Sequence, residues 1–285
     1  MRILFLSQVL PYPLDAGPKV RSYYVLRHLA QQHQVTLATF VRESDPPEAL
    51  DHLRGMVAHL APCPIRRSAW RNAAAISRSA LSGEPVLITR DHISEMSDLV
   101  GRLRADTPFE AIHADQLWMA PYALAAASAV RRARPRLILD QHNAVHLIPG
   151  RLAGGARNPL LRFGWTREAR QMARYEAKTC LAFDQVVTVT EVDRQALDGL
   201  YANGRRPPFV VIPICVDTQS VAPRPRATTP GILFLGFMHW PPNADGVGWF
   251  AEAILPAIHA SEAGARLLAI GRQPPGEDLR EEQRR

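Results

Sequence analysis

A short segment, residues 231–250 (GILFLGFMHWPPNADGVGWF), constrains the fold more than any other part of the chain. Its apolar run 232–235 predicts a buried strand, which Gly236 ends. Pro241 and Pro242 exclude a strand but are tolerated in the first turn of a helix, so a helix is expected to begin there. A strand, a glycine turn and a helix N-terminus together present backbone N–H groups to an anion. The segment therefore predicts an anion-binding unit.

Strands and helices are predicted to alternate from the first residues onward. Apolar runs indicate the strands, and helical periodicity indicates the segments between them. The predicted strands are Arg2–Ser7, Val35–Val41, Ala111–Ala114, Leu137–Asp140, Gln185–Val189, Val210–Ile212, Ile232–Leu235 and Arg266–Ile270, and the helices include Gly17–Gln32 and Pro46–His59. This order predicts an α/β fold with parallel, doubly wound sheets.

A proline-rich segment divides the predicted elements into two groups. Residues 218–230 (TQSVAPRPRATTP) offer little that packs, and we interpret them as a linker. Residues 1–217 then form one Rossmann-like domain and residues 231–285 begin a second. Such a domain typically needs about 100–150 residues. We therefore expect the second domain to be incomplete, and mobile or loosely docked.

Composition narrows the classes of protein to which the chain can belong. Its 285 residues, 47% of them hydrophobic, are enough for two cores. No apolar run reaches the roughly 18 residues of a membrane span. Three separated cysteines without a C-x-x-C motif suit a reducing cytoplasm and predict neither disulfides nor a zinc site. The net charge of +7 favours anionic partners, and no nucleic-acid-binding motif is visible.

Three segments carry a resemblance to a known family. Residues 231–250 hold a glycine, a methionine, a tryptophan, prolines and an asparagine in that order. VTVTEVD (187–193) joins a strand to an acidic helix start, and VIPICVD (211–217) leads into the proline-rich segment. In this order they resemble segments of the GT-B fold glycosyltransferases of family 4, the large retaining family with many members that build bacterial surface polysaccharide.

The resemblance implies transfer of a sugar from a nucleoside diphosphate sugar to a glycan or lipid-linked acceptor. It implies retained anomeric configuration, a role in polysaccharide biosynthesis and no metal or other cofactor. The location implied is the cytoplasm, or the inner face of the plasma membrane as a peripheral protein. The absence of a D-x-D run fits a metal-independent enzyme.

In the first domain, the resemblance points to the loop after the first strand. Gly17 is similar to the glycine that such enzymes place against the donor diphosphate, and Lys19 and Arg21 add positive charge. Without the resemblance, a lone glycine and two basic residues describe an ordinary loop with solvated side chains. We predict contact with the diphosphate through Gly17, Lys19 and Arg21.

Polar side chains follow two further strands, where ligands of open α/β sheets bind. His113 and Asp115 come after one strand, and the resemblance places them on the acceptor side; Asp115 also suits the N-cap of a helix from residue 117. Asp140, His142 and Asn143 come after the next strand. His142 matches a histidine that contacts the sugar near the transferred carbon, so we predict it to be catalytic, with Asp140 and Asn143 on the acceptor side. The alternative for His142 is a helix cap or a solvent-facing side chain.

In the second domain, Gly236, Asn243 and Arg272 are predicted to contact the diphosphate. Related enzymes commonly carry an arginine and a lysine where this chain has Phe237 and Asn243. We therefore expect charge neutralisation from the helix terminus, Lys19, Arg21 or Arg272. The family's pair of glutamates eight positions apart has no counterpart in the tail. The chain alone is accordingly expected to be inactive.

Other classes of function stay open. The chain fits a non-catalytic remnant or partner-binding subunit without a donor site, or a GT-B sugar-nucleotide epimerase. Residues 151–178 carry seven basic and two acidic side chains, with an apolar stripe at helical spacing. Such a helix suits peripheral contact with an anionic membrane. It equally suits a surface helix with its apolar side on the sheet, and the narrow stripe favours this second interpretation.

Overall fold

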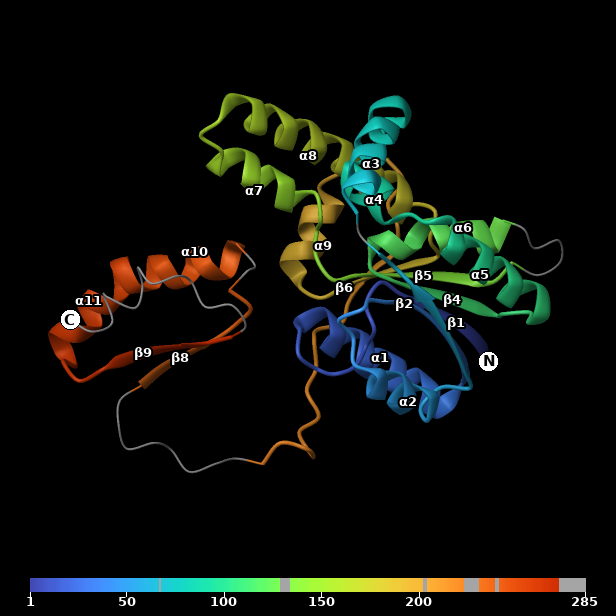
Figure 1. Cartoon of the computed structure of the whole chain (residues 1–285), viewed down its shortest axis with the longest axis horizontal. Coiled ribbons are helices and arrows are strands. Elements are labelled where there is room, and N and C mark those ends of the chain that lie inside the picture. Colours follow the sequence, from blue (N-terminus) through green and yellow to red (C-terminus); the bar gives the residue numbers. More distant parts are fainter. Residues whose placement is uncertain (67, 129–133, 202–203, 223–230, 239–240, 272–285) are drawn as a thin grey trace. The chain divides into compact units, whose positions relative to one another are not determined.

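The computed structural model describes the chain except residues 67, 129–133, 202–203, 223–230, 239–240 and 272–285 (Figure 1). Contacts within the chain divide it into two units, Met1–Val216 and Asp217–Arg285. The division falls at the start of the segment interpreted as a linker, whose residues 223–230 lie outside the described part. No helix in the described part combines the length and the apolar character needed to cross a bilayer.

The first unit is built on a seven-stranded parallel sheet in the order β3-β2-β1-β4-β5-β6-β7. The strands are β1 (Arg2–Ser7), β2 (Gln34–Val41), β3 (His59–Pro64), β4 (Ala111–Asp115), β5 (Arg136–Gln141), β6 (Gln185–Thr188) and β7 (Phe209–Val211). The chain runs outward from β1 to β3 and then returns to β4 on the other side of β1. The strand order thus reverses between β1 and β4, the position at which open α/β sheets bind ligands.

Helices cover both faces of this sheet (Figure 1). They are α1 (Gly17–Gln32), α2 (Pro47–Arg54), α3 (Ala69–Ser82), α4 (Val86–Asp91), α5 (Ser94–Asp106), α6 (Ala120–Ser128), α7 (Leu147–Gly155), α8 (Pro159–Cys180) and α9 (Glu191–Asp198). Alternate strand residues face opposite sides, so β1 feeds two cores. Phe5 packs with Leu26 of α1 on one side, and Leu6 packs with Met96 of α5 and Met172 of α8 on the other.

One predicted element is wrong in part. The predicted helix Pro46–His59 ends at Arg54, and His59 begins β3, a strand that the sequence analysis does not include. Gly55 caps the helix, and β3 carries two prolines, which obscure its strand character. Proline is tolerated there because β3 is an edge strand.

Two buried glutamates of α8 fix the starts of two other helices. Glu168 accepts the backbone N–H groups of Val86 and Leu87 at the first turn of α4. Glu176 accepts those of Val145 and His146, just before α7. Helix N-termini leave N–H groups unpaired and carry a positive dipole end, so a buried carboxylate stabilises them.

The second unit contains two parallel strands, β8 (Gly231–Leu235) and β9 (Arg266–Ile270), and a helical segment between them. The helical segment comprises α10 (Pro241–Trp249), a π-helical turn (Phe250–Ile254) and α11 (Leu255–Ser261). The predicted strand, glycine turn and helix are present. The expectation of a buried strand at 232–235 is wrong, because Leu233 and Leu235 are exposed and Ile232 and Phe234 are only partly covered.

Candidate active site

Polar side chains meet at the carboxyl ends of β1, β4 and β5, beside the point where the strand order reverses. Ser7 pairs in register with Asp115, and Asp115 pairs with Asp140. All three are buried. Three neighbouring parallel strands thus place one hydroxyl and two carboxylates side by side. Burying two carboxylates is costly unless each is paired, so their partners define the chemistry of this cluster.

Asp115 holds His142 through its carboxylate. Its Oδ1 lies 2.9 Å from His142 Nε2, while its Oδ2 accepts hydrogen bonds from Ser7 Oγ at 2.9 Å and Ser22 Oγ at 2.6 Å. Burial alone raises the pKa of Asp115, but the charge and hydrogen bond of His142 and the Ser22 hydroxyl outweigh burial and bring it below its ordinary value. Asp115 is therefore an ionised carboxylate that fixes the orientation of the His142 ring.

The pKa values of two histidines in this cluster are shifted in opposite directions. Burial lowers the pKa of His142, but the Asp115 carboxylate and the Asp140 charge reverse this effect and hold it above its ordinary value. Burial lowers the pKa of His113 and outweighs the nearby carboxylates. His113 stacks on Phe5 with 4.5 Å between ring centroids. The pKa values of the two imidazoles are thus moved apart, a pattern typical of sites that place two proton-exchanging groups in different roles.

The guanidinium of Arg21 forms hydrogen bonds within the protein. Its guanidinium binds both oxygens of Asp140 at 3.0 Å, and its Nη1 donates to the carbonyls of Ile212 and Pro213 at 2.5 and 3.1 Å. These bonds join α1 to β5 and to the segment after β7. Arg21 therefore acts as a positioning residue. Its predicted contact with a diphosphate stays a prediction, and Asp140 already compensates its charge.

The rest of the predicted diphosphate loop is more accessible. Gly17 is exposed, and a Cβ built there would meet nothing within 4 Å. The N-cap residue of α1, Ala16, offers no side-chain hydrogen bond to the helix N-terminus. Lys19 pairs with Asp15 at 3.1 Å and lies 3.9 Å from Asp45. Gly17 and the start of α1 therefore leave room for a phosphate, and the contact of this loop with a diphosphate stays a prediction.

Neither Asp115 nor His142 caps a helix, the alternative role that the sequence allows for each of them. Gln116, not Asp115, occupies the N-cap position before the short 3₁₀ turn Leu117–Met119, and the side chain of His142 bonds to Asp115. Asn143, also predicted for the acceptor side, is exposed immediately after His142.

Three residues of the cluster were missed by the sequence analysis. Ser7 and Ser22 carry no motif, and only their places beside Asp115 reveal them. Gln116 adopts φ 72° and ψ 157°, a backbone conformation that non-glycine residues rarely adopt. Its backbone N–H is held by the Asp140 carbonyl at 2.9 Å. A residue held in this conformation between two site carboxylates is typical of functional loops.

Three side chains of the cluster have ligand atoms close enough together to bind one metal ion. Ligand atoms of His113, Asp115 and Asp140 all lie within 4.8 Å of one another. Their oxygens already have partners, however, because Arg21 binds both oxygens of Asp140, and His142 and two serine hydroxyls bind Asp115. The Arg21 guanidinium beside these carboxylates opposes a cation. The described residues thus fit a polar organic ligand better than a metal ion.

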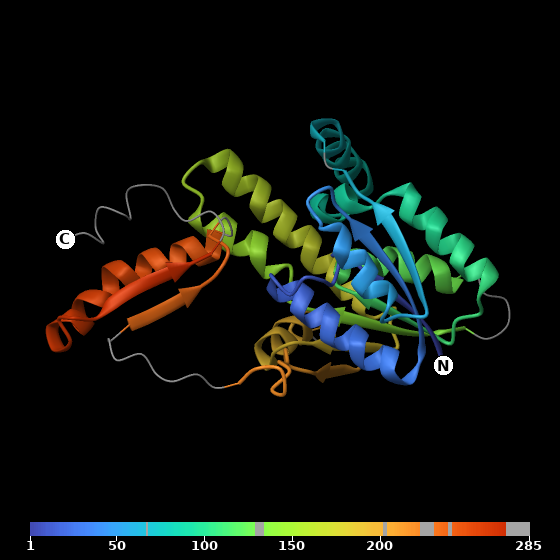
Figure 2. The same ribbon diagram turned by 60° about the horizontal axis from the view of Figure 1, so that its bottom comes forward.

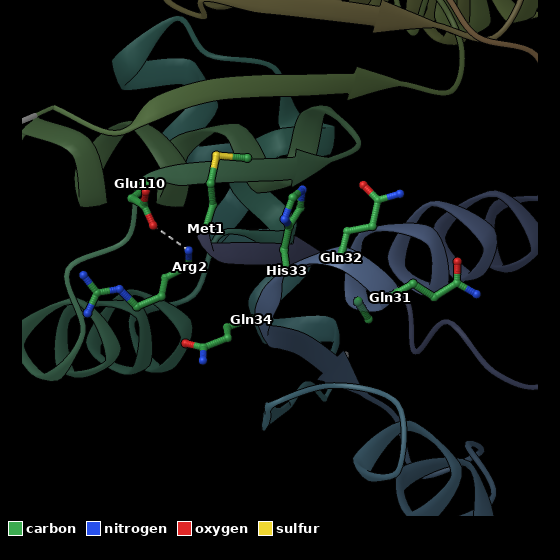
Figure 3. A pocket seen from close by; sticks show the side chains of 8 residues that line it. Met1, Arg2, Gln31, Gln32, His33, Gln34 and Glu110 are labelled. Carbon is green, nitrogen blue, oxygen red and sulfur yellow. Dashed lines mark hydrogen bonds between the residues drawn. The ribbon is translucent and has the colours of Figure 1, made fainter.

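A cavity of about 600 Å³ lies at the opposite, amino edge of the sheet (Figure 3). It is lined by Met1, Arg2, Ala30, Gln31, Gln32, His33, Gln34 and Glu110. The backbone N–H of Arg2 donates to Glu110 there at 2.8 Å. Ligands of open α/β sheets bind at the carboxyl ends of strands, so we do not assign the site to this cavity.

In the second unit, the predicted glycine turn is closely packed. The Asn243 side chain donates to the carbonyl of Phe237 at 3.0 Å. A Cβ on Gly236 would lie 2.7 Å from the ring of Phe234, and a Cβ on Gly271 would lie 1.7 Å from the carbonyl oxygen of Gly236. Two glycines thus let β8 and β9 end in close contact. Arg272 lies outside the described residues.

Comparison with known families identifies the family of the chain. The glycosyl transferase 4-like domain matches residues 16–215, which include every cluster residue except Ser7. The chain belongs to this family. No curated protein sequence is matched.

Solved structures show the fold of this glycosyl transferase 4-like chain. A mutant of S. aureus TarM, complexed with UDP, fondaparinux and alpha-GlcNAc-glycerol, has a TM-score of 0.57 at 10% identity, over 99% of this chain and 74% of TarM. OtsA has a TM-score of 0.51 at 14% identity, over 99% and 68%. Phytolacca americana UGT2 has a TM-score of 0.50 at 11% identity, over 97% and 64%. The chain therefore has the GT-B fold.

The chain spans between 60% and 74% of the length of such structures. The predicted α/β fold of GT-B type is confirmed, and so is the resemblance to family 4 glycosyltransferases. The carboxyl edge of the sheet carries two imidazoles whose pKa values are moved apart, and α1 starts after β1 at this edge. Such groups can hold sugar hydroxyls and a phosphate at the same time.

Proposed function

We propose that the chain supplies the acceptor-side half, and part of the donor side, of an enzyme that transfers a sugar from a nucleoside diphosphate sugar. Family membership supports sugar transfer in general. The observation that carries the proposal is the Asp115–His142 pair at the carboxyl edge, 2.9 Å apart and buried, with His142 held in one orientation. A glycan or a lipid-linked molecule is the acceptor, in polysaccharide biosynthesis.

His142 is the proposed catalytic residue. With Nε2 bound to Asp115, the buried Nδ1 of His142 has no hydrogen-bond partner among the described residues, and we assign to it the donation to a sugar oxygen. The raised pKa of His142 favours the protonated ring, in which this nitrogen carries a hydrogen. A charged donor placed before the reaction favours a transition state in which charge develops on the sugar and its leaving group. His113, Asp140 and Asn143 line the acceptor side.

The diphosphate is proposed to bind at helix starts without a metal. In the first unit these are Gly17 and the uncapped N-terminus of α1, beside Lys19. In the second unit, taken by itself, the candidate group is the backbone around Gly236 with the side chain of Asn243, and Arg272, predicted with them, lies outside the described residues. Helix N-termini stabilise phosphate through backbone N–H groups and the dipole. Retention of configuration is part of the same proposal.

The test follows the imidazole resonances of His113 and His142 by NMR while nucleoside diphosphate sugars and short glycans are added to the protein. We expect at least one sugar class to shift both resonances. His142→Ala should weaken that binding, while His59→Ala, an exposed change at the amino edge, should leave it intact.

Transfer itself is measured with radiolabelled nucleoside diphosphate sugars and a lipid extract, using an enzyme that contains this chain. No shift of either imidazole with any sugar would contradict a sugar site at this edge and favour a partner-binding subunit. A change of the sugar nucleotide without transfer to an acceptor would favour an epimerase.

A further inference from the structure

The hairpin formed by α7 and α8 ends in an exposed apolar tip. We define the tip as residues 156–164, the turn between the helices and the start of α8. Leu160, Leu161 and Phe163 are 81%, 59% and 71% exposed there. Single exposed apolar residues are ordinary, but three large ones within four positions form a patch. Such patches mark surfaces to which something binds.

The tip has a defined conformation. Asn158 caps α8 by accepting the backbone N–H groups of Leu160 and Leu161, and Pro159 occupies the first helical position. Figures 1 and 2 both show the end of the hairpin pointing away from the seven-stranded sheet. Further along α8, Met172 is fully buried. One helix thus packs on the core with its second half and presents apolar side chains outward with its first turn.

Positive charge surrounds these apolar side chains. Residues 151–167 contain four arginines and no aspartate or glutamate. Arg151, Arg157 and Arg162 are exposed, and none of their guanidinium groups has a hydrogen-bond or ion-pair partner among the residues that the structure describes. The next acid along α8, Glu168, is buried and bound to the backbone of α4. The tip therefore offers apolar surface and uncompensated positive charge together.

We infer that this tip docks on an anionic lipid bilayer. Leu160, Leu161 and Phe163 enter the boundary between headgroups and acyl chains, and the arginines contact the phosphates. Helix segments that combine leucine, phenylalanine and arginine in this way bind membrane interfaces, and anionic lipids strengthen the binding. A second copy of the chain is a poor occupant, because a two-fold interface would place the arginines of both copies against each other. The docking goes beyond sugar transfer and needs neither sugar nor nucleotide.

The test is flotation of the full chain with lipid vesicles. We expect binding to vesicles of phosphatidylcholine mixed with phosphatidylglycerol, little binding to phosphatidylcholine alone, and weaker binding at high salt. Leu160→Ser, Leu161→Ser and Phe163→Ser together should reduce the partition coefficient roughly tenfold or more. The control is Val192→Ser on α9, also an exposed apolar residue, which should bind as the unchanged protein does.

Charge is tested separately. Arg157→Gln with Arg162→Gln should reduce binding severalfold. The control pair, Arg136→Gln with Arg205→Gln, removes two exposed charges elsewhere and should have a smaller effect. All eight positions substituted in these two tests are exposed, so folding should be retained, which circular dichroism checks. If the triple variant does not fold, Phe163→Ser alone replaces it.

A fluorescent probe locates the contact directly. Cys63 and Cys180 are buried, so Cys215→Ser leaves Phe163→Cys as the accessible thiol for an environment-sensitive label. We expect a blue shift with anionic vesicles and none with neutral ones. Absent binding to anionic vesicles, equal binding of the triple and control variants, or a label shielded before lipid is added would overturn the inference. The last result would show that a protein surface covers the tip.

Discussion

The two units hold their loops in different ways. At the carboxyl edge of the first unit, Asp115 and Asp140 are buried, and each is paired through several hydrogen bonds. In the second unit the turn after β8 depends on close backbone contact between Gly236 and Gly271 and on one side-chain bond of Asn243. The first arrangement is supported by an extensive core, whereas the described part of the second unit buries only Met238, Val247 and Ala265.

The two loops are made rigid by different kinds of contact. Hydrogen bonds to a buried carboxylate fix the orientation of the side chains that make them, as Asp115 does for His142 and Asp140 for Arg21. A turn packed through glycines fixes the backbone but orients few side chains. Chemistry that needs an oriented side chain is therefore expected in the first unit, and backbone contact with an anion in the second. Four changes test this division.

The largest effect on stability is expected from Glu176→Ala. Glu176 is fully buried and accepts hydrogen bonds from two backbone N–H groups and from Gln141, and it pairs with His146 at 2.6 Å. Removing the carboxylate leaves those donors buried and unpaired. The free energy of unfolding of the first unit should fall by about 3 kcal/mol or more. Urea denaturation followed by far-ultraviolet circular dichroism measures it.

Glu252→Ala is the matched change in the second unit. Glu252 is exposed in the π-helical turn, so Glu252→Ala should leave the unfolding of both units by urea close to that of the unchanged protein. Equal losses from both variants would show that buried pairing does not distinguish the two units.

The second effect is on catalysis. In an active enzyme that contains this chain, His142→Ala should lower transfer roughly a hundredfold or more, because an oriented, charged donor is lost from the transition state. His28→Ala, an exposed change on α1, should leave transfer unchanged. Initial rates with a saturating sugar nucleotide measure the effect. Transfer within a few-fold of the unchanged enzyme, with folding intact, would assign His142 a purely structural role.

Much of the fold follows from the sequence because parallel strands are short apolar runs between helices. Six of the seven strands of the first unit are predicted near their observed bounds, and β3 is missed because His59–Pro64 contains two prolines. The meeting of Asp115, Asp140 and His142 also follows, because parallel strands end at one edge. Whether these residues bind a ligand stays a prediction.

The partners of these residues do not follow from the sequence. Arg21 and Asp140 lie 119 positions apart, and Glu176 lies 30 positions from His146. Such pairs depend on where whole helices settle on the sheet, and no local pattern encodes them. For the same reason a basic residue in a glycine loop suggests a phosphate contact, while the structure shows Arg21 paired inside the protein.

The third effect is expected in the second unit from Gly271→Ala. The added Cβ would lie 1.7 Å from the carbonyl oxygen of Gly236, so the ends of β8 and β9 must separate. Overpacking of this kind typically costs about 1–3 kcal/mol. Hydrogen exchange should quicken at the amides of β8 and β9 and stay unchanged in β1. Exchange of the unchanged protein should already be faster in β8 and β9 than in β1.

Gly17→Ala is the control in the first unit. A Cβ there meets nothing, so stability should be kept, and Ala in a helix start replaces the more flexible Gly. If a diphosphate approaches this glycine closely, the same change should weaken nucleotide binding. Unchanged nucleotide binding would remove Gly17 from the proposed diphosphate site. A Gly271→Ala protein with exchange like that of the unchanged protein would show that the glycine contact is not what holds β8 to β9.

The smallest effect is expected in how the contribution of the Asp115–His142 pair to the free energy of unfolding changes with pH. The folded pKa of Asp115 is lowered, so its contribution to stability is present above its unfolded pKa of about 3.9 and is lost as the pH falls. The folded pKa of His142 is raised, so its contribution is present below its unfolded pKa of about 6.5 and is lost as the pH rises through the raised value. Both contributions are complete between about pH 4 and 6.5.

Asp115→Asn should therefore destabilise the protein most in that window and less at alkaline pH, where His142 is neutral. Urea denaturation at a series of pH values measures this, with the exposed Asp245→Asn of the second unit as the control. A destabilisation by Asp115→Asn that does not change with pH would show that the pair is held by packing and not by charge.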